Sequence, residues 1–371
     1  MSMRAENRSH PGCSEAYILG TGANFHVTTF TLKHEHTFTW KNLNEVEINN
    51  VRTWGIHIFR LCDEVKHWLP NLIKTVEIFL GGLGLNPKIP FFGSRTPHYQ
   101  QELNIEFIEA GTGYRWKPRP NVFTNLSELE VKSGDFLAIT RLDGVDQIIQ
   151  YGAGSHSGHS AVVLEVDGEL CVVESQDGWY WPKHGIQRNK WSVWKKWALN
   201  AGFNVAVLPL TEESRKKFDV AKAAKFFKEM EGYPYGYHNF LFGWIDLPEG
   251  NLPSLLDKNL IMVVFSLIER LYEYPIKRIF TEGINMRLGT KGLKMAEIAV
   301  EISKRNMTLA DVMAMKEVDG WYYSDGYSYV CSSFVVAVYK AGGLLKDVEG
   351  TEMTPRDVKF AINVGLYLEH L

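Results

Sequence analysis

The chain has 371 residues, of which 45% are hydrophobic, 13% aromatic and 22% charged. These proportions exclude a disordered or collagen-like chain, and the length suits two domains or one large domain with insertions. The formal net charge of −3 argues against a protein that coats nucleic acid, so no nucleic-acid partner is expected.

The sequence shows neither a targeting signal nor a recognisable cysteine motif. The N-terminus has no apolar segment typical of a signal peptide, and no apolar run is long enough to cross a bilayer. We therefore expect no transmembrane segment and take the cytoplasm as the default compartment. The widely separated cysteines form no CxxC pair, zinc-finger spacing or disulfide framework. They are Cys13, Cys62, Cys171 and Cys331.

Residues 1–130 form a predicted N-terminal extension without a catalytic signature. Residues 27–38 alternate in a way that predicts a strand. Residues 51–80 have helical spacing, and Pro70 predicts a kink or a helix boundary there. Residues 86–97 are rich in Pro and Gly and predict a loop. The expected role is packing or covering, because function belongs to local sites.

Residues 131–371 form the predicted catalytic domain, of class α+β, with a small antiparallel sheet packed on a helix that begins near Cys331. A mostly helical insertion is expected at about 246–318, and Thr308 and Asp311 have capping-box spacing. Strands are predicted at 135–140, 160–166, 169–174 and 204–209, a Gly/Ser/His loop at 151–159, and further helices at 214–231 and from 354 onward.

The predicted hairpin around Asp167-Gly168 places polar side chains together. A two-residue turn there pairs position 161 with 174 and position 159 with 176. Since side chains alternate with period two, His159, Glu174 and Gln176 share one face. An imidazole beside a carboxylate is the base and orienting group of a catalytic triad. A purely structural His–Glu pair at a strand edge is the alternative.

Cys331 is the candidate nucleophile. It precedes an apolar helical face, so it lies in the first turn of a helix. A helix N-terminus stabilises a thiolate, which lowers the thiol pKa, and its free N–H groups can bind an oxyanion. An inert core cysteine is the alternative. Cys171 faces away from Glu174 between apolar residues and is interpreted as core.

The pattern resembles the circularly permuted NlpC-type branch of the papain-like cysteine hydrolases, which also includes lecithin–retinol acyltransferase-like proteins. The histidine strand precedes the cysteine helix, as in the permuted members. The resemblance covers about residues 131–245 and 319–345. Its motifs are Gly134-Asp135, Ser157-Gly158-His159, Glu174, Gly232-Tyr-Pro-Tyr-Gly236 and Tyr329-Val-Cys331-Ser-Ser-Phe-Val.

The resemblance implies roles for these residues. Cys331 is the implied nucleophile, His159 the general base and Glu174 the polar third residue, while Tyr235 lines the pocket or assists the oxyanion. The N-terminal extension and the helical insertion depart from the family's minimal form, which puts the substrate in doubt. Further candidates for substrate or oxyanion binding are Gln176, Ser157 and Trp179.

The implied chemistry is cleavage of an amide, in a peptide or an N-acyl amide, through an acyl-thioester on Cys331. No cofactor and no metal are implied. One alternative is a thiol acyltransferase or lipid ester hydrolase on the same site, with a lipid-like substrate. The other is a catalytically silent scaffold or binding protein of the same fold.

Several other features have competing interpretations. His156, His159 and His184 lack an acidic partner at ligand spacing, so a metal site there is not favoured. The Trp-rich basic segment 179–197 is either a packing surface or a substrate wall. The apolar face of 255–272 favours burial over a lid. His238 is interpreted as structural.

Overall fold

The structure is a computed structural model. It describes residues 131–153, 155–176, 185–242, 269–313, 315–346 and 348–355, together with residues 43, 48 and 265 and the N-terminal segments 2–4, 16–20, 25–29, 35–41, 57–60, 98–112 and 115–116.

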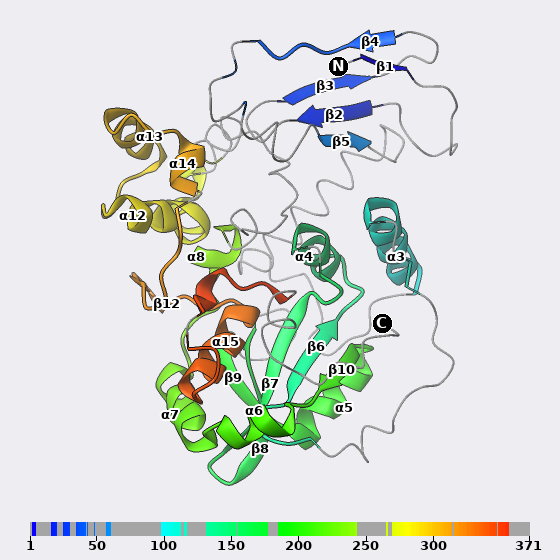
Figure 1. The fold of residues 1–371 in the computed structure, drawn as a ribbon, viewed down its shortest axis with the longest axis vertical. Coiled ribbons are helices and arrows are strands. Elements are labelled where there is room, and N and C mark those ends of the chain that lie inside the picture. The colour runs from blue at the N-terminus through cyan, green and yellow to red at the C-terminus, as the bar shows by residue number, and fades with distance from the viewer. Residues whose placement is uncertain are drawn as a thin grey trace.

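A five-stranded antiparallel sheet forms the centre of the described core, with the strand order β10-β6-β7-β8-β9. Helices lie against it, so the predicted α+β class with an antiparallel sheet is confirmed (Figure 1). The strands are β6 (Phe136–Thr140), β7 (His159–Val166), β8 (Glu169–Gln176), β9 (Gly185–Lys190) and β10 (Asn204–Leu208).

The predicted hairpin is confirmed in position and register. Val166 pairs with Glu169, and the ladder continues to Val162 opposite Val173. The backbone φ angles of Asp167 and Gly168 are 56° and 76°, the left-handed values that a two-residue hairpin turn needs. Because the register is set by the turn, it also fixes which side chains point to each face of the sheet.

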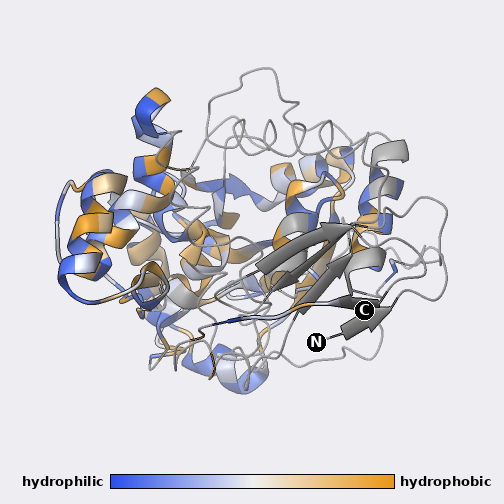
Figure 2. Cartoon of the chain, turned by 90° about the horizontal axis from the view of Figure 1, so that it is seen from above, coloured by the Kyte–Doolittle hydropathy of each residue, from blue (hydrophilic) through white to orange (hydrophobic). Residues whose placement is uncertain are grey.

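Each face of the sheet is covered by its own helices. Val162, Leu164 and Val173 pack with α7 (Val220–Met230) and α15 (Cys331–Ala341). The intervening residues pack on the other face against α5 (Trp191–Ala201), whose Trp194 is fully buried. Figure 1 shows this arrangement, and Figure 2 shows hydrophobic and hydrophilic residues together along the helices.

The structure corrects several predicted boundaries around the sheet. The helix predicted at 214–231 is two helices, α6 (Glu212–Lys217) and α7, because the Asp219 carboxylate caps α7 by accepting from the Lys222 N–H at 3.0 Å. Part of the predicted 151–159 loop belongs to α4 (Val145–Ala153). Strand β9 and helix α5 were not predicted.

The described part of the helical insertion has a core of its own. Its residues Phe280, Ile284 and Ile298 pack together, and the predicted capping box is present, since Thr308 N donates to Asp311 Oδ2 at 2.6 Å. The elements are α11 (Glu273–Ile276), the π-helix η1 (Lys277–Thr281), α12 (Glu282–Leu288), α13 (Met295–Lys304) and α14 (Leu309–Met313). Most of the apolar segment 255–272 lies outside the described residues.

The N-terminal region contributes short strands and one helix to the described structure. β2 pairs antiparallel with β3 and β5, β1 pairs with β4, and these strands lie at the top of Figure 1. The helical prediction for 51–80 is wrong at 57–60, where pairing with β2 makes a strand. Their bounds are β1 (Ser2–Arg4), β2 (Ala16–Gly20), β3 (Phe25–Thr29), β4 (Glu35–Thr37) and β5 (His57–Arg60).

Helix α3 (His98–Thr112) connects this region to the core. It packs against α4, and the Asn104 side-chain amide donates to the Leu142 carbonyl at 3.0 Å. Among the described residues, no helix combines the length and the apolar character that crossing a membrane requires.

Candidate active site

His159 and Glu174 form a buried pair across the β7–β8 hairpin. His159 Nε2 lies 2.8 Å from Glu174 Oε2, and the two residues are 3% and 1% exposed. An ionised Glu174 carboxylate can only accept, so in that state Nε2 donates the proton and Nδ1 of a neutral ring keeps the free lone pair. The predicted juxtaposition of His159 and Glu174 is therefore present.

Trp194 completes the environment of the carboxylate. Its indole Nε1 donates to Glu174 Oε1 at 3.0 Å, so each oxygen of Glu174 has a donor. Trp194 stacks on Trp191 at 5.9 Å between ring centroids. Sequence reasoning missed this role, because it read the Trp-rich segment as one surface. The spacing of Trp191, Trp194 and Ala198 is helical and gave the signal for α5.

Cys331 lies at the first residue of α15, as predicted, and is 4% exposed. The Ser160 N–H points at its sulfur and lowers the thiol pKa, as does the Ser332 N–H. The sulfur therefore lies beside the start of β7, one residue from His159. At this point β8 is held to the chain before Cys331 by Ser175 Oγ, which donates to the Tyr329 carbonyl at 2.7 Å.

The imidazole and the thiol lie on different faces of the sheet. His159 pairs with Ile139, which packs on the α5 face, whereas α15 covers the opposite face. In the described structure, no hydrogen bond joins the Cys331 sulfur to the His159 ring. The structure thus brings Glu174 onto His159 and the thiol onto the neighbouring backbone, without a direct hydrogen bond between the thiol and the imidazole.

Burial controls the protonation of both groups. It raises the pKa of Cys331 to about 11, so the expectation that the helix N-terminus leaves the pKa lowered is wrong. Burial also lowers the pKa of His159 well below its usual range, an effect to which the Arg141 guanidinium adds. In this closed arrangement the thiol and the imidazole are both neutral at pH 7.

A buried ion pair lies close enough to affect both groups. Arg141 Nη2 and Asp146 Oδ1 are 3.1 Å apart, and Arg141 lowers the pKa of His159 and of Cys331 whereas Asp146 raises both. Asp146 approaches the chain before the histidine so closely that a Cβ on Gly158 would lie 2.7 Å from its Cα. The glycine in Ser157-Gly158-His159 is thus required by packing.

A pocket opens at Cys331. Tyr235 lines it, as predicted, and forms a bridge to Tyr329. A Cβ on Gly236 would meet the Tyr329 backbone at 2.3 Å, so only glycine permits this approach. The lining is uncharged. It consists of Ile149, Tyr235, Asn239, Phe240, Val330, Cys331, Ser332, Thr351, Met353, Thr354 and Pro355.

The remaining predicted site residues differ in their placement. Gln176 is 1% exposed, and its Nε2 has no hydrogen-bond partner in the described structure. Ser157 is buried in the turn before β7, where its N–H donates to Ser155 Oγ at 3.2 Å. Trp179 lies outside the described residues, as does His184. Cys171 is buried in the core on the α15 face, as interpreted from the sequence.

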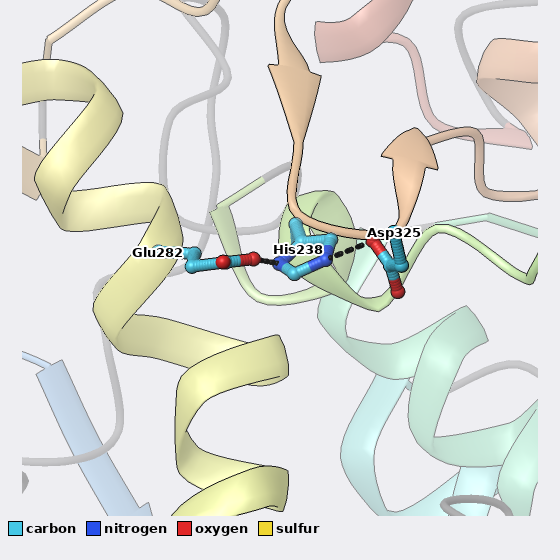
Figure 3. A group of neighbouring side chains, drawn as sticks. All are labelled: His238, Glu282 and Asp325. Atoms are coloured by element: carbon cyan, nitrogen blue, oxygen red, sulfur yellow. Dashed lines mark hydrogen bonds and ion pairs between the residues drawn. The ribbon is translucent and has the colours of Figure 1, made fainter. Parts of the chain in front are cut away.

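His238 lies between two carboxylates. Its Nε2 is 2.8 Å from Asp325 Oδ1 and its Nδ1 is 3.3 Å from Glu282 Oε2 (Figure 3). Ligand atoms of these three residues lie within 4.8 Å of one another, the one such group among the described residues. Arg278 pairs with Asp325 and Lys277 with Glu282, so cationic side chains already balance both carboxylates. The arrangement fastens the insertion to the turn before Cys331.

Comparison with known proteins identifies no relative: no family model, curated protein or solved structure matches the chain. The functional argument therefore rests on the residues and their geometry.

Proposed function

We propose that the protein is a thiol hydrolase that cleaves an amide through an acyl-thioester on Cys331. The observation that carries the proposal is the buried His159–Glu174 pair, with Nε2 to Oε2 at 2.8 Å, beside a cysteine at a helix start that lines a pocket. The order of these elements, with the histidine strand first and the cysteine helix last, also supports a permuted papain-like core.

The proposed reaction begins when an amide carbonyl enters the pocket. The thiol proton passes to His159 Nδ1 while Sγ bonds to the carbonyl carbon, and the Glu174 carboxylate stabilises the resulting imidazolium. The imidazolium then protonates the leaving amine nitrogen as the C–N bond breaks. Water hydrolyses the thioester, with His159 taking its proton and returning one to sulfur, so an acid and an amine are released.

Proton transfer requires the imidazole and the thiol to meet at the start of β7. The two residues flank the same backbone position, since the thiol lies at the Ser160 amide. In the proposal, the substrate binds before the thiol ionises, because burial otherwise keeps Cys331 protonated. A neutral resting pair that ionises only on encounter still allows nucleophilic catalysis.

The pocket's uncharged and mostly apolar lining supports an uncharged acyl group. It suits the acyl chain of a lipid as well, which keeps a thiol acyltransferase or lipid ester hydrolase as the second candidate. A silent binding protein of the same fold is the third, and the raised pKa of Cys331 favours it.

A thiol-reactive probe tests the proposal. We expect N-butyl-2-chloroacetamide to label Cys331 in the wild-type protein, with loss of labelling in Cys331→Ala, read by intact mass and peptide mapping. Cys171→Ala is the matched control, because Cys171 is equally buried but lies within the core, and it should label like wild type. Labelling that persists in Cys331→Ala contradicts the proposal.

A further inference from the structure

Asn239 is a buried polar residue in the wall of the Cys331 pocket. It lies on α8 (Tyr237–Phe240), directly after the Tyr235-Gly236 segment, and is 2% exposed. The mechanism proposed above does not use it.

One end of the Asn239 side chain has a partner that fixes its orientation. Nδ2 donates to the Ser328 carbonyl at 3.2 Å, and because a carbonyl can only accept, the amide nitrogen must point there. The other end, Oδ1, is then an acceptor, and it has no hydrogen-bond partner in the described structure. A buried acceptor without a donor destabilises the protein unless water or a ligand supplies one.

The other residues that line the pocket favour a neutral donor over a charged one. Phe240 and Met353 are apolar, and no charged side chain is among the pocket's lining residues. A cationic donor would lose its hydration there without a counter-charge, whereas one hydrogen bond to Oδ1 would compensate a neutral N–H for the hydration it loses.

We propose that Asn239 Oδ1 accepts a hydrogen bond from a neutral N–H next to the substrate carbonyl, which makes the substrate a secondary amide rather than an ester. This rests on the proposed function of Cys331. It selects the amide hydrolase over the lipid ester hydrolase, because an ester oxygen has no proton to donate and leaves Oδ1 unpaired.

Three probes of matched length test this inference on the full chain: N-butyl-2-chloroacetamide, N-butyl-N-methyl-2-chloroacetamide and butyl chloroacetate. In each, the Cys331 sulfur displaces chloride, forming a C–S bond, and the thiol proton passes to His159 and from there to the buffer. Rates of Cys331 alkylation are divided by the rate of each probe with N-acetylcysteine, which removes intrinsic reactivity. We expect the N–H probe to react at least about tenfold faster than the other two.

One variant assigns the preference to the acceptor. Asn239→Leu should abolish it, because leucine has a similar size and no acceptor. The wild-type comparison stands by itself if Asn239→Leu does not fold. Equal normalised rates for the three probes in wild type, with labelling still dependent on Cys331, overturn the inference and leave the proposed function intact. Labelling that does not depend on Cys331 overturns the proposed function instead.

Discussion

The two faces of the five-stranded sheet are built by different forces. On the α15 face, apolar side chains such as Val162 and Phe334 fill the core, and packing places Cys331 at the helix start. On the α5 face, a chain of hydrogen bonds from Trp194 through Glu174 to His159 runs through an otherwise apolar layer. The strands supply both faces at once, since alternate residues point in opposite directions.

The separation of the imidazole and the thiol by the sheet limits where the proposed reaction can occur. An imidazole on one face and a thiol on the other can cooperate only where β7 begins, at His159 and Ser160, because the sheet separates them elsewhere. Burial keeps the thiol neutral on one side and the imidazole neutral on the other. The predictions that follow test whether the two faces act together, from the largest expected effect to the smallest.

The sharpest test removes the imidazole. His159→Asn should slow alkylation of Cys331 by N-butyl-2-chloroacetamide by about 10²–10⁴-fold, because general-base assistance to the thiol is lost. His156→Asn is the control, since His156 is exposed in the segment just before β7, and it should leave the rate unchanged. An unchanged rate in His159→Asn would mean that the two faces are chemically independent and that His159 has no part in the mechanism.

A second test uses the pH dependence of stability. The pKa of Cys331 is raised from an ordinary 9.0 to about 11, so the folded protein keeps a proton that the unfolded chain releases above pH 9. The free energy of unfolding should therefore fall by about 2 kcal/mol between pH 9 and pH 11 because of this group.

Denaturant titrations of wild type and Cys331→Ala at both pH values measure this contribution, because the difference between the two proteins isolates Cys331. The stability lost by wild type over this interval should exceed that lost by the variant by the stated amount. The same loss in both proteins would show that the thiol is more hydrated than its burial indicates.

The smallest expected effect belongs to Trp194, as a positioning residue. Trp194→Phe removes the indole donor to Glu174 Oε1 and should slow Cys331 alkylation about tenfold. It should also raise the pKa of His159, followed by NMR titration, because the carboxylate then keeps more negative charge for the imidazolium. If Trp194 acts only in packing, the substitution leaves the pKa of His159 unchanged.

Trp191→Phe is the matched control for Trp194. Trp191 lies on the same helix, stacks on the Trp194 ring and is 8% exposed. The indole that donates a hydrogen bond to Glu174, however, is that of Trp194. Equal effects of the two substitutions on the pKa of His159 would assign Trp194 to packing.

Local sequence signals predicted much of the candidate site. The Asp167-Gly168 turn and the two-residue period placed His159 and Glu174 on one face, and the structure has them 2.8 Å apart. The apolar helical spacing after Cys331 predicted a helix with Cys331 in its first turn, and α15 begins at Cys331. Short-range geometry is enough for such elements, because a turn or a helix is specified by residues a few positions apart.

Other local signals led to wrong predictions, or were not recognised, because contacts in the folded chain decided the outcome. Residues 57–60 have helical spacing but form a strand, since β2 offers them backbone partners. The break at Asp219 followed from a cap that the apolar pattern concealed. The pKa of Cys331 rose although the helix N-terminus favours the thiolate, because desolvation outweighed the helix dipole.

The sequence by itself determined the hairpin, its register and the helix that begins at Cys331, because each depends on neighbours in the chain. Only the tertiary structure decided that Trp194 holds Glu174, that Asn239 lines the pocket and has a buried oxygen without a partner in the described structure, and that the thiol and the imidazole lie on opposite faces of the sheet. Those features depend on contacts between distant residues and on the exclusion of water, and neither is encoded in local spacing.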